Sequence, residues 1–128
     1  MHVFEYATLR VVPRPEREEF LNVGVMLLCR AQGFLEARFT VSEARLRGCF
    51  GETLDLPDLA ARLDAIGRIC RGRAEGGPIG QQGLAERFRW LTAARSTVVQ
   101  TSAVHPGLCA DAAQTLARLF EQLVGGGG

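Results

Sequence analysis

Three segments near the start of the chain have the hydrophobic patterns of β-strands. Residues 3–12 (VFEYATLRVV) are rich in β-branched and aromatic types and stop at Pro13, which cannot donate a ladder hydrogen bond. Residues 22–30 form a nearly continuous apolar run, which is typical of a central strand covered on both faces. After a tight turn at 31–33, residues 34–41 alternate between apolar and polar, which predicts a third strand antiparallel to the second.

The pattern changes to a helical period in the middle of the chain. Asp55 or Asp58 can cap a helix there, Pro57 suits its first turn, and Gly72 marks its end. The apolar residues of this predicted helix recur at three- and four-residue spacing: Leu59, Leu63, Ile66 and Cys70. Residues 75–83 (EGGPIGQQG) are interpreted as a flexible connector, because glycine and proline dominate them.

Three more elements are predicted after the connector. A second helix carries Leu84, Phe88 and Leu91, and we expect Trp90 beside them to pack in the core. Residues 96–104 (STVVQTSAV) are predicted to form a fourth strand. Asp111 opens the last helix in a variant of the capping box. The apolar stripe of that helix is Ala112, Leu116, Leu119, Phe120 and Leu123.

Strands in a run followed by helices predict an α+β fold. We expect an antiparallel sheet of about four strands, in the element order β-β-β-α-α-β-α, with the helices packed mainly on one face. The 128 residues fit a single α+β domain, which we assign to residues 1–124, and the glycines at 125–128 form a flexible tail. No run of about 18 apolar residues is present, so we expect no membrane-spanning helix.

The charge and cysteine content narrow the class of protein. All 15 basic residues are arginine, yet the formal net charge is only +1. A nucleic-acid binder normally has a strong basic excess, so we expect no nucleic-acid partner. The N-terminus lacks the basic and apolar segments of a secretory signal, which predicts a cytoplasmic protein with reduced thiols. None of the four cysteines belongs to a CxxC pair, and we expect all of them to be buried: Cys29, Cys49, Cys70 and Cys109.

The connection between the first two predicted strands is longer than a usual hairpin loop and strongly charged. Arg14, Glu16 and Arg17 lie in it, and we expect Phe20 at its end to pack inward. Such charges either keep a solvated loop soluble or contact a partner. Arg14, Glu16 and Arg17 are therefore the candidate partner-binding residues.

Arg10 is unusual because it lies inside the first predicted strand, between two apolar residues. A buried guanidinium must be paired, and Glu5 or Glu36 would supply an ion pair across the sheet. In the alternative interpretation, Arg10 is presented on an open sheet face to bind an anion.

The most concentrated polar stretch contains Arg95, Ser96, Gln100 and His105. An arginine, a hydroxyl, an amide and an imidazole are the groups of a phosphate or carboxylate pocket, in which His105 is the candidate proton carrier. In a strand these side chains alternate between two faces, so they would not all converge. His105, followed by Pro106 and a glycine, also suits a turn. No metal-ligand spacing or cofactor motif occurs, and we predict neither a metal nor a cofactor.

Several blocks of sequence carry a family resemblance: YATLRVVPRPEREEFLNVGVMLLCR, FLEARF, PIG and ERFRWLTAARSTVVQTSAVHPGLC. Together they resemble the bacterial family called domain of unknown function 3037, over essentially the whole chain apart from the glycine tail. That family has no established activity. The resemblance implies a compact cytoplasmic bacterial protein and, through neighbouring genes for HipA-like kinases, a kinase-like partner. It draws attention, without assigning roles, to Tyr6, Arg10, Asn22, Gly24, Arg38, Trp90, Arg95, Ser96, Gln100 and His105.

Two functional hypotheses follow from these features. The small size, the lack of a cofactor motif and the charged loop favour a non-catalytic binding module or partner subunit, as in a HipA-like kinase system. The alternative is a small enzyme or ligand binder acting on a phosphorylated or nucleotide compound. Arg10 and Arg95 would then hold the anion and His105 would carry the proton. A homodimer formed through an edge strand stays open.

Overall fold

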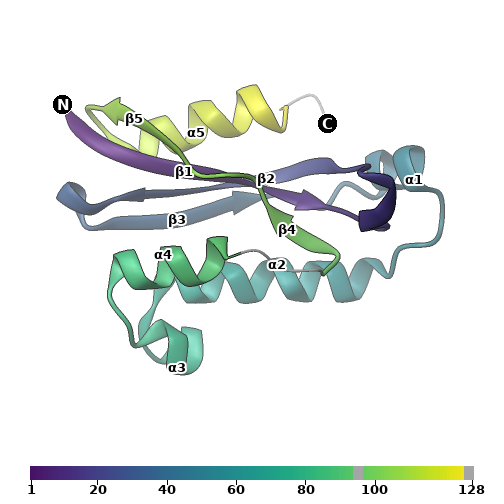
Figure 1. Cartoon of the computed structure of the whole chain (residues 1–128), viewed down its shortest axis with the longest axis horizontal. Coiled ribbons are helices and arrows are strands. Elements are labelled where there is room, and N and C mark those ends of the chain that lie inside the picture. Colours follow the sequence, from purple (N-terminus) through teal and green to yellow (C-terminus); the bar gives the residue numbers. More distant parts are fainter. Residues whose placement is uncertain (94–96, 126–128) are drawn as a thin grey trace.

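A computed structural model describes residues 1–93 and 97–125. In this part of the chain, an open antiparallel sheet is the centre of the fold (Figure 1). Its five strands are β1 (His2–Val11), β2 (Leu21–Cys29), β3 (Phe34–Phe39), β4 (Val99–Thr101) and β5 (His105–Cys109). The strand order is β3-β2-β1, and β4 and β5 pair with the remaining edge of β1, one after the other. The predicted α+β class and the antiparallel pairing of the second and third strands are confirmed.

Helices cover both faces of the sheet, with the larger group on one of them (Figure 1). They are α1 (Glu43–Phe50), α2 (Leu56–Arg71), α3 (Gly77–Gly80), α4 (Leu84–Thr92) and α5 (Ala112–Leu123). α5 lies alone on one face, mainly over β2 and β3, whereas α2 and α4 pack on the other. None of the helices described is both long and apolar enough to cross a membrane.

The apolar run of β2 is buried on both faces, as its sequence predicts. Val25, Leu27 and Cys29 pack against α5, while Met26 and Leu28 pack against the side of α2 and α4. The helix caps also form as predicted. They are Asp55, whose carboxylate accepts from the backbone N–H of residue 58, and Asp111, whose carboxylate accepts from residues 113 and 114.

Of the described residues in the predicted fourth strand (96–104), 99–101 form β4, and a fifth strand that was not predicted, β5, follows it. β4 pairs with residues 9–11 of β1, and the chain then leaves the ladder at 102–104 before β5 pairs with residues 2–6. The expectation of a turn at His105 is wrong, because β5 begins there. Gly107 makes this strand possible, since a Cβ atom at this position would lie 2.5 Å from the ring of Phe4, which is buried.

Two further segments differ from the sequence prediction. The segment from Glu43 to Phe50 is helical although no helix was predicted there, and Leu46 is its one fully buried residue. The connector at 75–83 contains α3 and the end of a 3₁₀ turn (Arg73–Gly76). Short 3₁₀ turns also occur at Pro15–Arg17 and Arg30–Gln32.

Two side chains expected in the core are exposed. Trp90 of α4 is 39% exposed, because the core-facing positions of this helix belong to Arg87, Phe88 and Leu91. Cys49 is exposed on α1, whereas Cys29, Cys70 and Cys109 are buried as predicted. The short α1 buries a single residue and leaves Cys49 on its outer side.

We expect Cys49 to be the one cysteine that reacts with iodoacetamide in the native protein. The thiolate is the reacting form, and burial raises the pKa of Cys70 to about 12, while burial next to Cys29 raises the pKa of Cys109. Mass spectrometry should therefore find one adduct under native conditions and four in urea, and no native adduct in Cys49→Ser. Equally rapid labelling of a second cysteine in the native protein would contradict this prediction.

Candidate functional site

A β-bulge in β2 brings Arg10 and Asn22 face to face. In the register of β1 and β2, Leu9 lies opposite Gly24, but the next residue, Arg10, lies opposite Asn22, so Val23 is the extra residue. Without the bulge, Asn22 would lie opposite Val11 and point into the core on the side of α2. Bulges commonly redirect side chains next to functional sites.

Four polar residues gather on the side of the sheet that carries α5. Arg10 of β1 lies opposite Asn22 of β2 on one side and opposite Gln100 of β4 on the other. Asn22, Arg10 and Gln100 therefore form a row across three strands. Thr8 precedes them on the same face of β1, opposite Val25. We call Thr8, Arg10, Asn22 and Gln100 the polar cluster. α5 lies mainly over β2 and β3. The part of β1 that carries Thr8 and Arg10 is therefore next to the end of α5 and not beneath the helix.

Three buried atoms of the polar cluster have no hydrogen-bond partner among the residues that the structure describes. They are the hydroxyl oxygen of Thr8, Nε of Arg10 and Oδ1 of Asn22. Buried polar atoms are nearly always hydrogen-bonded, so three such atoms at adjacent positions are unusual. The amide of Gln100 is engaged, since its nitrogen donates to the carbonyl oxygen of Thr97 at 3.0 Å.

Phe20 covers Arg10. The guanidinium carbon lies 4.1 Å from the centre of the phenyl ring, a cation–π contact. Phe20 is 49% exposed, so the prediction that it packs inward is wrong: the ring lies on the arginine instead. The predicted ion pair with Glu5 does not form, because Glu5 lies on the opposite face of β1. Among the described residues Arg10 forms no salt bridge.

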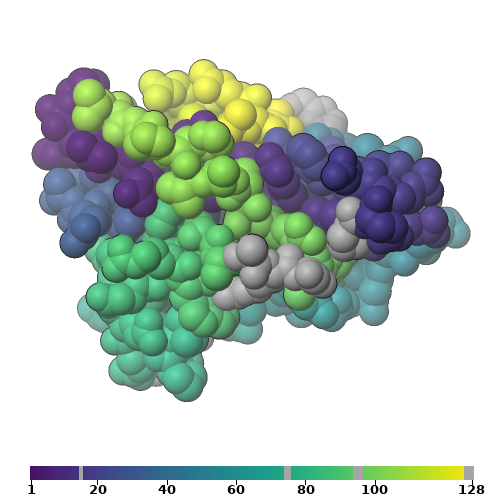
Figure 2. All heavy atoms as spheres, in the orientation of Figure 1, coloured from purple at the N-terminus to yellow at the C-terminus, as the bar shows by residue number. Residues whose placement is uncertain are grey.

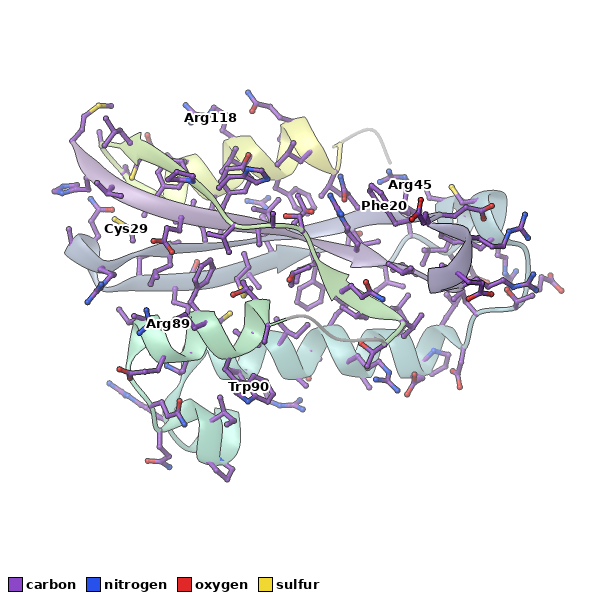
Figure 3. The ribbon with its side chains drawn as sticks, in the orientation of Figure 1. Phe20, Cys29, Arg45, Arg89, Trp90 and Arg118 are labelled. Carbon is purple, nitrogen blue, oxygen red and sulfur yellow. The ribbon has the colours of Figure 1, made fainter. Side chains whose placement is uncertain are left out.

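Two polar side chains hold the end of α5 next to the polar cluster. The Asn22 amide nitrogen donates to the carbonyl oxygen of Leu123 at 3.4 Å, and the Arg45 guanidinium donates to that of Val124 at 3.0 Å. Figure 3 shows Arg45 and Phe20 at the end of the sheet where α5 ends. Arg45 therefore adds a second positive charge beside the one that Arg10 brings to the cluster.

His105 does not join the polar cluster. It lies opposite Tyr6, with ring centres 5.3 Å apart, and Tyr6 is four residues from Arg10 on β1, or about 13 Å. Arg95 and Ser96 lie outside the described residues. Of the predicted anion-binding residues, the structure thus brings together Arg10 and Gln100. No group of three metal-ligating side chains occurs in the described ranges.

The candidate partner-binding residues of the charged loop are exposed. Arg14, Glu16 and Arg17 follow β1 directly, and Arg17 forms an ion pair with Glu19 at 3.3 Å between exposed groups. The loop borders a hollow of about 360 Å³ that is also lined by Cys49 and Phe50 of α1. These positions are open to a partner, and their role stays a prediction.

A second surface, which no sequence pattern predicts, lies at the opposite end of β1. Val3 of β1 and Leu108 of β5 are paired directly across the two strands and are 63% and 60% exposed. Met1 and Val104 are exposed nearby in the chain. We call Met1, Val3, Val104 and Leu108 the apolar edge. Figure 2 shows β5 and the beginning of β1 side by side on the surface.

Comparison with known proteins identifies the family. Residues 6–124 match the family model described as "Protein of unknown function (DUF3037)", which covers nearly the whole chain. Neither the curated proteins nor the solved structures give a significant match. The polar cluster lies within the matched residues, as do Val104 and Leu108 of the apolar edge, whereas Met1 and Val3 precede them. On this evidence the chain belongs to the DUF3037 family.

Proposed function

We propose that this protein is a small non-catalytic binding module that docks a protein partner through the apolar edge. The main support for this docking surface is the exposed pair Val3 and Leu108, which lie opposite each other on β1 and β5. Single exposed apolar residues are ordinary, but neighbouring ones on an open sheet edge are typical of interaction surfaces. Burying such a pair against a partner removes apolar area from water and so favours association.

The residues of β5 indicate how the partner would bind. Pro106 has no backbone N–H, so it weakens any continuous strand added along β5, including the same strand of a second copy. The partner would therefore pack its own apolar side chains on Val3 and Leu108 rather than extend the sheet. Glu5 lies beside this pair, opposite Pro106, and would belong to the polar rim of the interface.

The test compares the two candidate surfaces. Tagged protein would be purified from its native host as the wild type, as Val3→Glu/Leu108→Glu and as Arg14→Glu/Arg17→Glu. We expect one stoichiometric partner to be retained by the wild type and the loop variant and lost from the edge variant. The partner would then be produced separately, and the edge variant should bind it at least tenfold more weakly, about 1.4 kcal/mol.

Other outcomes would contradict the proposal. Loss of the partner from the loop variant alone would move the interface to Arg14 and Arg17. Self-association that is lost only in the edge variant would make this surface a homodimer contact. All four substituted residues are exposed, so the variants should melt like the wild type, which keeps the comparison valid. The HipA-like kinase implied by the family resemblance stays a prediction about the partner's identity.

A further inference from the structure

We infer that the polar cluster binds a phosphate group that carries a proton, as inorganic phosphate or a phosphate monoester does. This inference does not depend on the proposed docking surface, which lies at the other end of β1. Each of the three unpartnered atoms limits what can occupy the cluster.

The chain fixes the role of each atom. The Asn22 amide nitrogen donates to the carbonyl oxygen of Leu123, which orients the amide and leaves Oδ1 as an acceptor that needs a donor. Nε of Arg10 can only donate. The backbone N–H and carbonyl of Thr8 are both bonded to Ser102, so its hydroxyl is left to bind something else. At adjacent positions the cluster therefore offers one donor (Arg10), one acceptor (Asn22) and one hydroxyl that can donate and accept (Thr8).

These requirements select among anions. The Nε and one terminal nitrogen of an arginine form a fork that matches two oxygens of a carboxylate, sulfate or phosphate. Near neutral pH, carboxylate, sulfate and phosphate diesters offer only acceptors, which leaves Asn22 Oδ1 unpaired. A phosphate that keeps a proton offers both acceptor oxygens and a P–O–H donor for Asn22. A monoester has its second pKa near 6, so it carries this proton in slightly acidic solution.

Charge and access agree with this ligand. Arg10 has no carboxylate partner among the described residues, and Arg45 adds a second positive charge at the same end of the sheet. The three atoms are covered in this conformation, and Phe20 is the cover over Arg10. Its ring is half-exposed and lies outside the core, so it can rotate away without opening the core. Exposed side chains change rotamer quickly.

The experiment is calorimetric titration of the full chain at about pH 6, where about half of a phosphate monoester keeps a proton. The probes are inorganic phosphate, glycerol 3-phosphate, sulfate and dimethyl phosphate. We expect inorganic phosphate to bind, alone or together with glycerol 3-phosphate. Sulfate and dimethyl phosphate should bind at least tenfold more weakly. Binding of glycerol 3-phosphate as tightly as inorganic phosphate would identify an ester as the source of the group, whereas phosphate alone would indicate the free anion.

Three variants keep the inference open to refutation. Thr8→Val and Arg10→Gln should each weaken phosphate binding at least tenfold, while Arg118→Gln, the same charge change on exposed α5, should leave it unchanged. Thr8→Val keeps the side-chain shape and removes an unpaired hydroxyl, so it should melt no lower than the wild type. Equal binding of sulfate and phosphate would overturn the inference, as would no binding at millimolar phosphate by the folded wild type.

Discussion

Replacing Arg87 with methionine is expected to lower the free energy of unfolding by about 3 kcal/mol. Arg87 lies on α4 with 8% of its surface exposed. Its guanidinium donates to the carbonyl oxygens of Gln82, Ile69 and Cys70 at 2.9, 2.8 and 2.6 Å. Two of these carbonyls belong to the last turn of α2, where no helical N–H can reach them. Methionine fills part of the volume but leaves all three acceptors without this donor.

The surroundings of Arg87 show that the position requires an arginine. The positive charge lies at the carboxyl end of α2, where the helix dipole favours a cation. Gly72 follows that end with φ of +79°, and a Cβ atom there would lie 2.8 Å from a terminal nitrogen of Arg87. The guanidinium therefore occupies the space that a side chain at residue 72 would take.

The matched control for this prediction is Arg89→Met, two residues along the same helix and exposed. It removes the same charge without opening a buried hydrogen-bond network, so we expect a change within about 0.5 kcal/mol. Urea unfolding followed by circular dichroism would measure both. A similar small change for the two variants would show that the three hydrogen bonds of Arg87 contribute little.

Arg87 also illustrates where sequence patterns stop being informative. The apolar spacing predicts α4 correctly, but an arginine in an amphipathic helix is normally solvated, and nothing local distinguishes a buried one. Two of its three partners lie 17 and 18 residues away on another helix. The predicted α2 shows the opposite case, because its cap, its apolar spacing and its terminal glycine are all local signals.

The elements that were missed have weak or contradictory local signals. α1 carries few apolar residues and buries one, so it has no stripe to detect. β5 contains Pro106 and Gly107, which predict a turn, but the long β1 offers a backbone edge that β5 completes. Pairing with a distant strand thus overrides the local preference.

The candidate site was predictable in part. An arginine in the middle of a strand stood out, and Gln100 was identified in the polar stretch that pairs with it. Thr8 and the role of Asn22 were not identified, because their placement depends on the bulge. β2 is apolar on both faces, so a one-residue change of register leaves no trace in its hydrophobic pattern.

Replacing Gly24 with alanine is expected to cost about 2–3 kcal/mol and to disturb the polar cluster. Gly24 follows the extra residue of the bulge and lies between Leu9 of β1 and Phe39 of β3. A Cβ atom at this position would lie 2.7 Å from the carbonyl oxygen of Arg38 and 2.7 Å from Cβ of Phe39. These are atoms of a central sheet, so they cannot move away as a flexible side chain would.

The strain of an alanine at Gly24 can be relieved by shifting the strands at the bulge, and that shift would move Asn22 away from Arg10. We therefore expect Gly24→Ala to lose phosphate binding as well as stability. Gly48→Ala is the control, because Gly48 lies in α1 with nothing within 4 Å of the added atom. Alanine favours helix there, so stability should rise by up to about 1 kcal/mol. Urea unfolding and phosphate titration of both variants would test this, and normal stability of Gly24→Ala would show that the bulge tolerates a side chain.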